Sequence, residues 1–171
     1  PMLVLLLLPV VALLFSASPA DLAAGLEHPL FSPALSLSLR STLVSLGVIL
    51  LGGTPLAWWL ARSTSSSRSV IEAVVAMPLV LPPTVLGFYL LIMLNPESAF
   101  GSLWVELTGD SLTFSFSGLV IASIIYSLPF MVQPLQAGFR AVPESVLEAA
   151  ATLGASPLDR WLNVVLPMVK R

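Results

Sequence analysis

The sequence predicts an all-α membrane protein, a polytopic bundle of membrane-spanning helices that forms a single domain over residues 1–171. Two observations support this fold class. Hydrophobic residues make up 57% of the chain and charged residues only 9%, with a mean hydropathy of +0.98, whereas a soluble domain carries about 25% charged residues. The charged residues also leave long gaps, over residues 1–20, 41–61, 73–96 and 111–139.

These gaps are long enough to hold membrane helices. About 20 apolar residues are needed to cross roughly 30 Å of hydrocarbon. We therefore predict membrane spans near residues 2–17, 41–61, 73–94 and 115–138. The first of these stretches is also typical of a signal-peptide core followed by a cleavage site ending at Ala20. A retained helix and a cleaved signal both remain open for this segment.

The basic residues predict the orientation in the membrane, because cytoplasmic segments carry an excess of Lys and Arg. The segments 16–39 and 95–114 contain acidic residues but no basic one, and are predicted to be external. Arg40, at the outer end of the second span, is the exception and can extend its charge to the interface. Trp58 and Trp59 fit an aromatic belt at the inner face. The other six basic residues follow the second or the fourth span, namely Arg62, Arg68, Arg140, Arg160, Lys170 and Arg171.

The residue types exclude most catalytic and metal-binding chemistry. The chain has no cysteine, and its one histidine, His28, lies in a loop between Glu27 and Pro29. The stretch GVILLGGT, residues 47–54, lacks the lysine of a phosphate-binding loop, so its glycines are predicted to allow close helix packing instead. We expect no catalytic residue, no metal site, no cofactor and no nucleic-acid partner.

Three prolines interrupt the third span close to its middle. Proline has no backbone N–H and breaks a helix, and irregular backbone at this depth is tolerated where it packs against protein or lines a wet cavity. A half-helix that restarts at Pro83 and Thr84 would direct its positive dipole end inward, toward a passing anion. A hinge or gate and a bend that only fits neighbouring helices both remain open. The pathway or gate candidates are Pro78, Pro82, Pro83, Thr84, Gly87 and Gln133.

Uncharged polar residues also lie in the fourth span. Gln133 and Gln136 are three residues apart and share one helix face, near Tyr126 and Ser127. Such side chains either form hydrogen bonds between helices, which is their commoner use, or line a pathway.

Residues 143–166 predict a short helical hairpin after the fourth span. Pro143 suits the first position of a helix, and Gly154 can supply the left-handed residue that ends it. Ser156 and Asp159 match a capping box at the start of a second helix. Helices that lie on membranes are rich in Lys and Arg, whereas the first of these helices presents glutamates and alanines. This contrast favours docking to a protein over a lipid-surface or packed-hairpin role.

The same hairpin resembles the EAA signature of ABC-importer permeases. The match consists of Glu148-Ala149-Ala150, three residues, Gly154, nine residues, Val164, one residue and Leu166-Pro167, with Val164 in place of the usual isoleucine. Together with MPLVLPPTVLGFYLLIM and SLPFMVQPLQAGFRAVPESVLEAAATLGAS, it makes the chain most similar to molybdate/tungstate permease subunits. Sulfate permeases are the nearest relatives, and the resemblance covers about residues 35–171.

This resemblance implies a type I ABC importer permease, a non-catalytic transport subunit of a bacterial or archaeal cytoplasmic (inner) membrane. The implied partners are membrane lipid, a separate ABC ATPase on a cytoplasmic coupling helix-turn-helix, an extracytoplasmic oxyanion-binding protein and a second permease copy in a homodimer. The implied ATPase-coupling residues are Glu148, Ala149, Ala150, Leu153, Gly154, Pro157 and Leu158.

Other functions remain open beside the import of molybdate or tungstate. A sulfate or thiosulfate permease of the same superfamily is one alternative, and a secondary transporter or channel-like protein without an ATPase is another. Permeases of this family continue with further membrane helices after the signature. We therefore expect the chain to be a fragment whose C-terminal helices are missing, and a shortened member of the family is the alternative.

Overall fold

The computed structural model describes residues 7–9, 11–12, 16 and 18–169, and all regular elements within them are helices. The span predicted near residues 2–17 lies largely outside these residues. The chain divides into two units, residues 1–40 and residues 41–171, and each unit is described by itself.

The first unit contains the short helix α2 (Pro19–Glu27) and the beginning of the long helix α3 (Phe31–Arg62). Ser18 caps α2, because its hydroxyl accepts a hydrogen bond from the Asp21 backbone N–H at 3.1 Å. Residues 31–39 belong to a segment that is predicted to be external, but they are helical and form the beginning of α3. Pro33 lies in the first turn of α3, where a missing N–H costs no hydrogen bond. Arg40 therefore lies inside this helix and not at its end.

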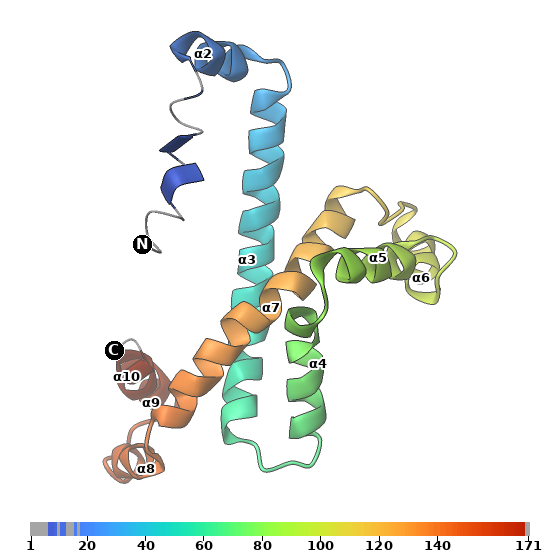
Figure 1. Ribbon diagram of the computed structural model, residues 1–171. Helices are drawn as coiled ribbons and strands as arrows, with labels where there is room; N and C mark the ends of the chain where they lie inside the picture. The colour runs from blue at the N-terminus through green and yellow to red at the C-terminus, as the bar shows by residue number, and fades with distance from the viewer. Residues whose placement is uncertain (1–6, 10, 13–15, 17, 170–171) are drawn as a thin grey trace. The chain divides into compact units, whose positions relative to one another are not determined.

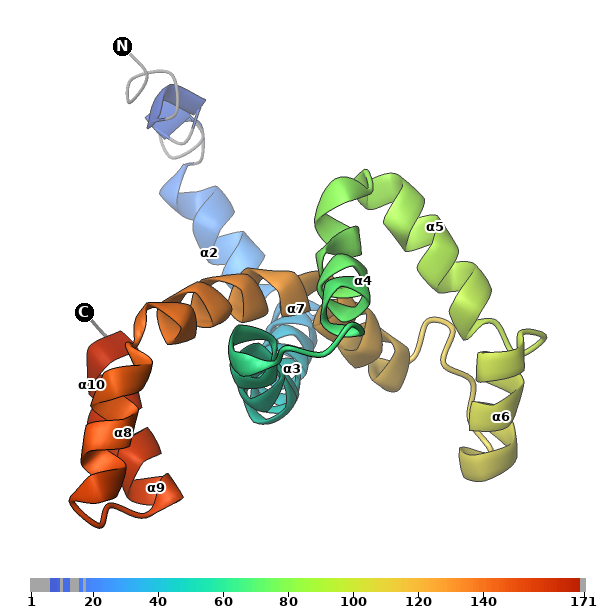
Figure 2. The same ribbon diagram turned by 90° about the horizontal axis from the view of Figure 1, so that it is seen from below.

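In the second unit, α4 (Arg68–Val80) lies beside the C-terminal half of α3, and α7 (Phe116–Ala141) crosses both (Figures 1 and 2). Small residues on α3 allow this close crossing. The Ser45 hydroxyl donates to the Val120 carbonyl at 3.4 Å, and a Cβ at Gly53 would lie 3.5 Å from the Met131 and Val132 side chains. The buried stripe of α3 consists of Ser41, Ser45, Ile49, Gly53, Ala57 and Leu60.

The packing prediction for the glycines of residues 47–54 holds for only one of them within the described chain. A Cβ at Gly53 would be in van der Waals contact with α7, whereas a Cβ at Gly47 or at Gly52 would have nothing within 4 Å. The helical period explains this difference, because Gly53 continues the four-residue spacing of the buried stripe and the other two glycines do not.

The core of the second unit lies where α3, α4, α7 and the segment after α7 meet. The Trp58 ring of α3 packs edge-on against the Phe139 ring of α7, with centroids 5.3 Å apart. Other helices contribute apolar side chains to the same cluster. Its buried members are Ala57, Leu60, Val75, Val132, Phe139, Val142 and Val165.

The prolines of the third predicted span produce a sharp break. α4 ends at Val80, α5 (Pro83–Leu94) restarts at Pro83, and the two helices are bent by 116°. The N–H groups of Val85 and Leu86 both donate to the Pro82 carbonyl at 3.0 Å, which starts the new helix. After α5, the short helix α6 (Ala99–Thr108) lies within the segment predicted as an external loop.

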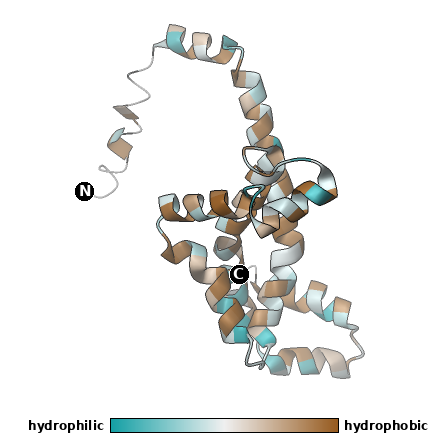
Figure 3. Cartoon of the chain, turned by 90° about the vertical axis from the view of Figure 1, so that its right-hand side faces the viewer, coloured by the Kyte–Doolittle hydropathy of each residue, from teal (hydrophilic) through white to brown (hydrophobic). Residues whose placement is uncertain are grey.

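Two of the described helices, α3 and α7, are long and apolar enough to cross a membrane, and the bent pair α4–α5 makes a third if it is counted as one span. Hydrophobic residues cover much of these helices, and hydrophilic residues gather at their ends and in loops (Figure 3). Many large apolar side chains are exposed, including Leu51, Val80 and Phe88. Such a surface suits a hydrocarbon solvent and not water.

Candidate functional site

The segment after α7 forms the predicted hairpin, although its first helix starts one residue later than expected. It consists of α8 (Glu144–Thr152), α9 (Pro157–Arg160), the π-helical turn η1 (Trp161–Val165) and α10 (Leu166–Val169). Pro143 was predicted at the first helical position but is the cap, with an extended ψ of 138°. Val142 is extended too, as a residue before proline prefers to be. These two extended residues turn the chain from α7 into α8.

The corner of the hairpin is built by a left-handed glycine. Gly154 has a φ of 84°, its N–H donates to the Ala151 carbonyl at 3.0 Å, and the Ala155 N–H donates to the Ala150 carbonyl at 3.1 Å. This pair of hydrogen bonds is a Schellman motif, which satisfies the last carbonyls of a helix. The prediction of a left-handed residue at Gly154 is confirmed.

The second arm of the hairpin starts with the predicted capping box. The Ser156 hydroxyl accepts from the Asp159 N–H at 3.2 Å, and the Asp159 carboxylate accepts from the Ser156 N–H at 3.2 Å and from its hydroxyl at 2.5 Å. These hydrogen bonds from Ser156 stabilise the ionised carboxylate and lower the pKa of Asp159 below its ordinary value. The cap predicted at Ser156 and Asp159 is confirmed.

A wide turn interrupts the second arm where a regular helix was expected. At the end of η1 the Leu166 N–H donates to the carbonyl of Trp161, five residues before it. Pro167 follows directly, and in a regular α-helix its ring would crowd the carbonyl of Asn163. The wider turn lies at the point where this crowding would arise.

Most of the predicted coupling residues are exposed at the corner of the hairpin. Leu153 is 88% exposed and Leu158 is 66% exposed. Ala150 is partly buried, and Leu147, which the prediction did not include, packs against the core. Neighbouring exposed leucines at a chain corner are typical of a binding surface. The remaining predicted residues, Glu148, Ala149, Gly154 and Pro157, are exposed.

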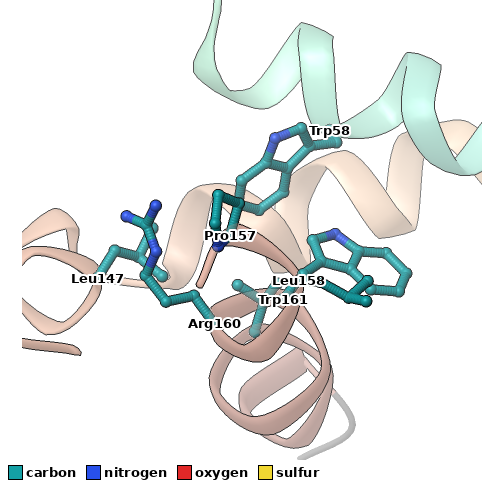
Figure 4. A pocket seen from close by; sticks show the side chains of 7 residues that line it. Trp58, Leu147, Pro157, Leu158, Arg160 and Trp161 are labelled. Atoms are coloured by element: carbon teal, nitrogen blue, oxygen red, sulfur yellow. The ribbon is translucent and has the colours of Figure 1, made fainter. Parts of the chain in front are cut away.

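A mostly apolar cavity of about 420 Å³ separates the hairpin from α3. Trp58 of α3 points toward the hairpin residues Pro157 and Trp161 across this space (Figure 4). Sequence reasoning placed Trp58 only in an aromatic belt, and the one signal for this contact was a second tryptophan, Trp161, within the hairpin. The cavity is lined by Trp58, Leu147, Pro157, Leu158, Arg160, Trp161 and Val165.

Arg62 contacts the end of α7, directly before the hairpin. Its Nη2 donates to the carbonyl oxygens of Phe139 at 3.1 Å and Val142 at 2.8 Å. The guanidinium also lies 5.1 Å from the centre of the Trp58 ring. A cation at a helix C-terminus is favourable both for the helix dipole and for the terminal carbonyls, which lack the regular partners of the helix interior. From the sequence, Arg62 indicates only the orientation in the membrane.

Glu72 of α4 contacts α7 from another side. Its carboxylate accepts from Arg140 at 3.2 and 3.4 Å and from the Gln136 side chain at 3.2 Å. Gln136, which is 3% exposed, also donates to the Leu60 carbonyl at 3.5 Å. Of the two interpretations of this glutamine, hydrogen bonding between helices is the one that matches these contacts.

The pathway candidates do not form a single cluster. Pro82, Pro83 and Thr84 are exposed at the break between α4 and α5, and Pro78 lies partly buried inside α4. Gly87 is partly buried in α5 with open space around its Cα. Gln133 is exposed on α7, so it and Gln136 have different surroundings although they were assigned to one face.

Comparison with known proteins covers most of the chain. Residues 53–171 match the family described as binding-protein-dependent transport system inner membrane component. The molybdenum transport system permease protein ModB of Azotobacter vinelandii is 51% identical over 84% of this chain and 63% of its own length. A probable molybdenum ABC transporter permease of Haloferax volcanii is 36% identical over 96% of this chain and 60% of its own length.

A molybdate/tungstate transport system permease protein of Thermococcus kodakarensis is 31% identical over 92% of this chain and 60% of its own length. The chain thus spans about three fifths of the length of these curated relatives. The family match includes the proline break, α7 and the whole hairpin. The chain is a multi-pass inner-membrane protein and belongs to the family of binding-protein-dependent transport system inner membrane components.

Proposed function

We propose that the chain is the permease part of an ATP-driven importer of an oxyanion, with molybdate as the expected substrate. The single observation that supports this most is the exposed corner of the hairpin, Leu153 to Leu158, held on the α3–α7 core. The relatives named above are molybdenum or molybdate/tungstate permeases, and the family is binding-protein-dependent. The chain itself carries no chemistry in this proposal, and a separate ATPase hydrolyses the ATP.

The hairpin is the proposed docking element for that ATPase. Its first helix, α8, has the acidic Glu148 and several exposed apolar residues but no Lys or Arg, the residues that would bind anionic lipid. Leu147 and Trp161 pack inward against the core, so a force on the corner is carried into the bundle. The proposed contact residues are Glu148, Ala149, Ala150, Leu153, Gly154, Pro157 and Leu158.

The orientation follows from this assignment. An ATPase is cytoplasmic, so the hairpin and the loop between Arg62 and Arg68 would face the cytoplasm, in agreement with the positive-inside rule. The residues on the opposite side would face an extracytoplasmic oxyanion-binding protein. A second permease copy would complete the assembly, because the described bundle exposes apolar helices on several sides.

The break between α4 and α5 is the proposed gate region. The bend of 116° exceeds an ordinary proline kink. The N-terminus of α5 is therefore not continuous with α4. Its dipole and the exposed Thr84 hydroxyl suit weak, transient contact with an anion. Pro78, Pro82, Pro83, Gly87 and Gln133 are the other proposed pathway residues.

Import can be tested directly in proteoliposomes. We expect uptake of labelled molybdate to require the ATPase, ATP and the binding protein together. Competition with tungstate and sulfate would rank the substrates, and strong preference for sulfate would favour the sulfate permease alternative. Uptake without any ATPase would contradict the proposal and favour a secondary transporter or channel.

The docking surface needs its own test. Leu153→Asp places a charge at the exposed corner, and Ser145→Asp places the same charge at an exposed position near the start of α8. Loss of a central apolar contact weakens binding by about 2 kcal/mol or more, so the Leu153→Asp permease should lose its ATPase during purification. Equal ATPase retention by both variants would contradict docking at this corner.

A further inference from the structure

The junction between α7 and the hairpin depends on contacts from outside both elements. The last carbonyl groups of a helix lack the partners that interior carbonyls have; that of Phe139 accepts from the Val142 N–H at 3.4 Å. The chain then turns at Val142 and Pro143 through extended conformations. Such a junction can bend unless its carbonyls are held. Only the junction connects the hairpin covalently to α7, so whatever holds it controls how motion of the hairpin reaches the rest of the bundle.

Arg62 holds this junction from α3. One guanidinium nitrogen donates to a carbonyl on each side of the α7 terminus, Phe139 at 3.1 Å and Val142 at 2.8 Å. These residues are 77 and 80 positions away in the sequence. Hydrogen bonds from a charged donor are stronger than those between neutral groups, and they contribute more than an exposed ion pair usually does.

The aromatic neighbours of Arg62 link the same residue to the hairpin. Its guanidinium lies against Trp58, and Trp58 packs both on the buried Phe139 and along the cavity lined by hairpin residues Pro157 and Trp161. A cation over a tryptophan face is attracted to the ring, which further fixes the position of the guanidinium. Arg62 is thus the one side chain at this junction, within the described residues, that bonds to the α7 end and also lies over a wall of the hairpin cavity.

We propose that Arg62 is a positioning residue that couples the hairpin to α3. It acts through the carbonyls of Phe139 and Val142, keeping α7, the hairpin and the end of α3 in one rigid arrangement, so that a push on the hairpin tilts α3 as well as α7. The inference rests on the proposed function, because it assigns Arg62 a role in transmitting ATPase motion. It adds a residue that lies outside the hairpin and outside the EAA signature.

Arg68 provides a matched control in the same loop region. It donates to the Ser63 carbonyl at 3.3 Å and lies 3.9 Å from the Glu72 carboxylate. Both partners belong to the α3–α4 connection or to α4 itself, and neither is in α7. Arg68→Ala therefore removes an arginine of similar position without releasing the α7 carbonyls.

The test uses the full-length permease with its ATPase and binding protein in proteoliposomes, and measures molybdate imported per ATP hydrolysed. For Arg62→Ala we expect ATPase retention and ATP hydrolysis to persist while this ratio falls on the order of tenfold, equivalent to about 1.4 kcal/mol of lost coupling. Arg62→Lys, which keeps the charge but lacks the planar guanidinium that lies over Trp58, should be intermediate. Arg68→Ala should match the unsubstituted permease. A purely structural role would lower hydrolysis and import together and leave the ratio unchanged.

A second measurement covers the case in which Arg62→Ala folds poorly. Spin labels at the exposed Ser66 and Ser145 report the distance between the α3–α4 loop and α8. We expect a narrow distribution in the parent and in Arg68→Ala, and a broader one in Arg62→Lys.

The outcomes separate the two proposals. An unchanged import ratio in Arg62→Ala, or a distribution in Arg62→Lys as narrow as the parent's, would overturn the role of Arg62 while leaving the importer proposal intact. A parent permease that neither retains an ATPase nor imports molybdate would instead overturn the proposed function.

Discussion

Trp58 of α3 and Phe139 of α7 are packed edge to face, with ring planes at 81° and centroids 5.3 Å apart. Phe139 is fully buried, and its backbone carbonyl accepts from Arg62. At the end of α7, Phe139 thus packs through its ring on Trp58 and is capped through its carbonyl by Arg62. Because α8, the first helix of the hairpin, starts only five residues later, this contact fixes the position from which the hairpin begins.

Removal of the Phe139 ring should destabilise the bundle. A buried Phe→Ala substitution costs about 3–5 kcal/mol, so Phe139→Ala should lower the melting temperature of the purified permease by several degrees or more. Phe88→Ala is the control, because Phe88 is 61% exposed on α5. The unfolding can be followed by circular dichroism in detergent, and an equal change in both variants would contradict the central role of the ring.

The ion pair between Glu72 and Arg140 should respond to charge exchange. Their nitrogen–oxygen distance is 3.2 Å, and the Glu72 carboxylate also accepts from the buried Gln136. We expect Glu72→Arg or Arg140→Glu alone to destabilise the permease, since each places like charges together. The double exchange should recover about 1 kcal/mol or less of this loss, because both side chains are about 40% exposed. If the double exchange recovers none of the lost stability in a double-mutant cycle measured by thermal unfolding, Glu72 and Arg140 do not interact directly.

Gly154→Val should distort the hairpin corner through the backbone alone. A Cβ there meets nothing within 4 Å, so no neighbouring atom opposes it, but the φ of 84° is unfavourable for valine by roughly 1–2 kcal/mol. We expect the corner to change its angle and the permease to retain less ATPase. Gly52→Val, in the open middle of α3, is the control. Normal co-purification and uptake with Gly154→Val would show that the angle of the corner is unimportant.

The capping box of the hairpin should be sensitive to acid. Hydrogen bonds from Ser156 lower the pKa of Asp159 in the folded state. Its contribution to stability is therefore fully present above the ordinary pKa of aspartate, near 3.9, and is lost as the pH falls through the lower folded value. Amide hydrogen exchange at the start of α9 should increase below about pH 4, and Asp159→Asn should show the increase at neutral pH. Exchange that stays constant between pH 6 and pH 3, after correction for intrinsic rates, would contradict this.

The proline break should straighten when its cause is removed. Pro82 and Pro83 have no backbone N–H, so the helical hydrogen bonds of α4 cannot continue into α5. Replacing both with alanine should therefore reduce the bend of 116°. Spin labels at the exposed Val70 and Ile92 would then move apart, because a straight helix rises 1.5 Å per residue. If the distance stays at its parent value, packing around the break and not the prolines sets the angle.

Much of this protein follows from local sequence. The length and spacing of apolar stretches predict α3 and α7, because crossing hydrocarbon requires internally bonded helices of a known length. The left-handed Gly154 and the Ser156–Asp159 cap involve residues only a few positions apart. Their geometry depends on hydrogen bonds between residues that are close in the sequence, so it can be predicted without the tertiary structure. The restart of α5 at Pro83 is of the same kind.

Other features were decided by the tertiary structure. The extension of α3 back to Phe31 and the cap position of Pro143 depend on how the chain continues on both sides, and the sequence prediction placed them differently. The sequence shows that Arg62 is basic and that Gln136 carries an amide, but not what they bind. Phe139, a partner of Arg62, is 77 positions away, and Glu72, a partner of Gln136, is 64 positions away. A polar side chain can satisfy itself with many groups, and only the packing of α3, α4 and α7 brings particular carbonyls and carboxylates within reach.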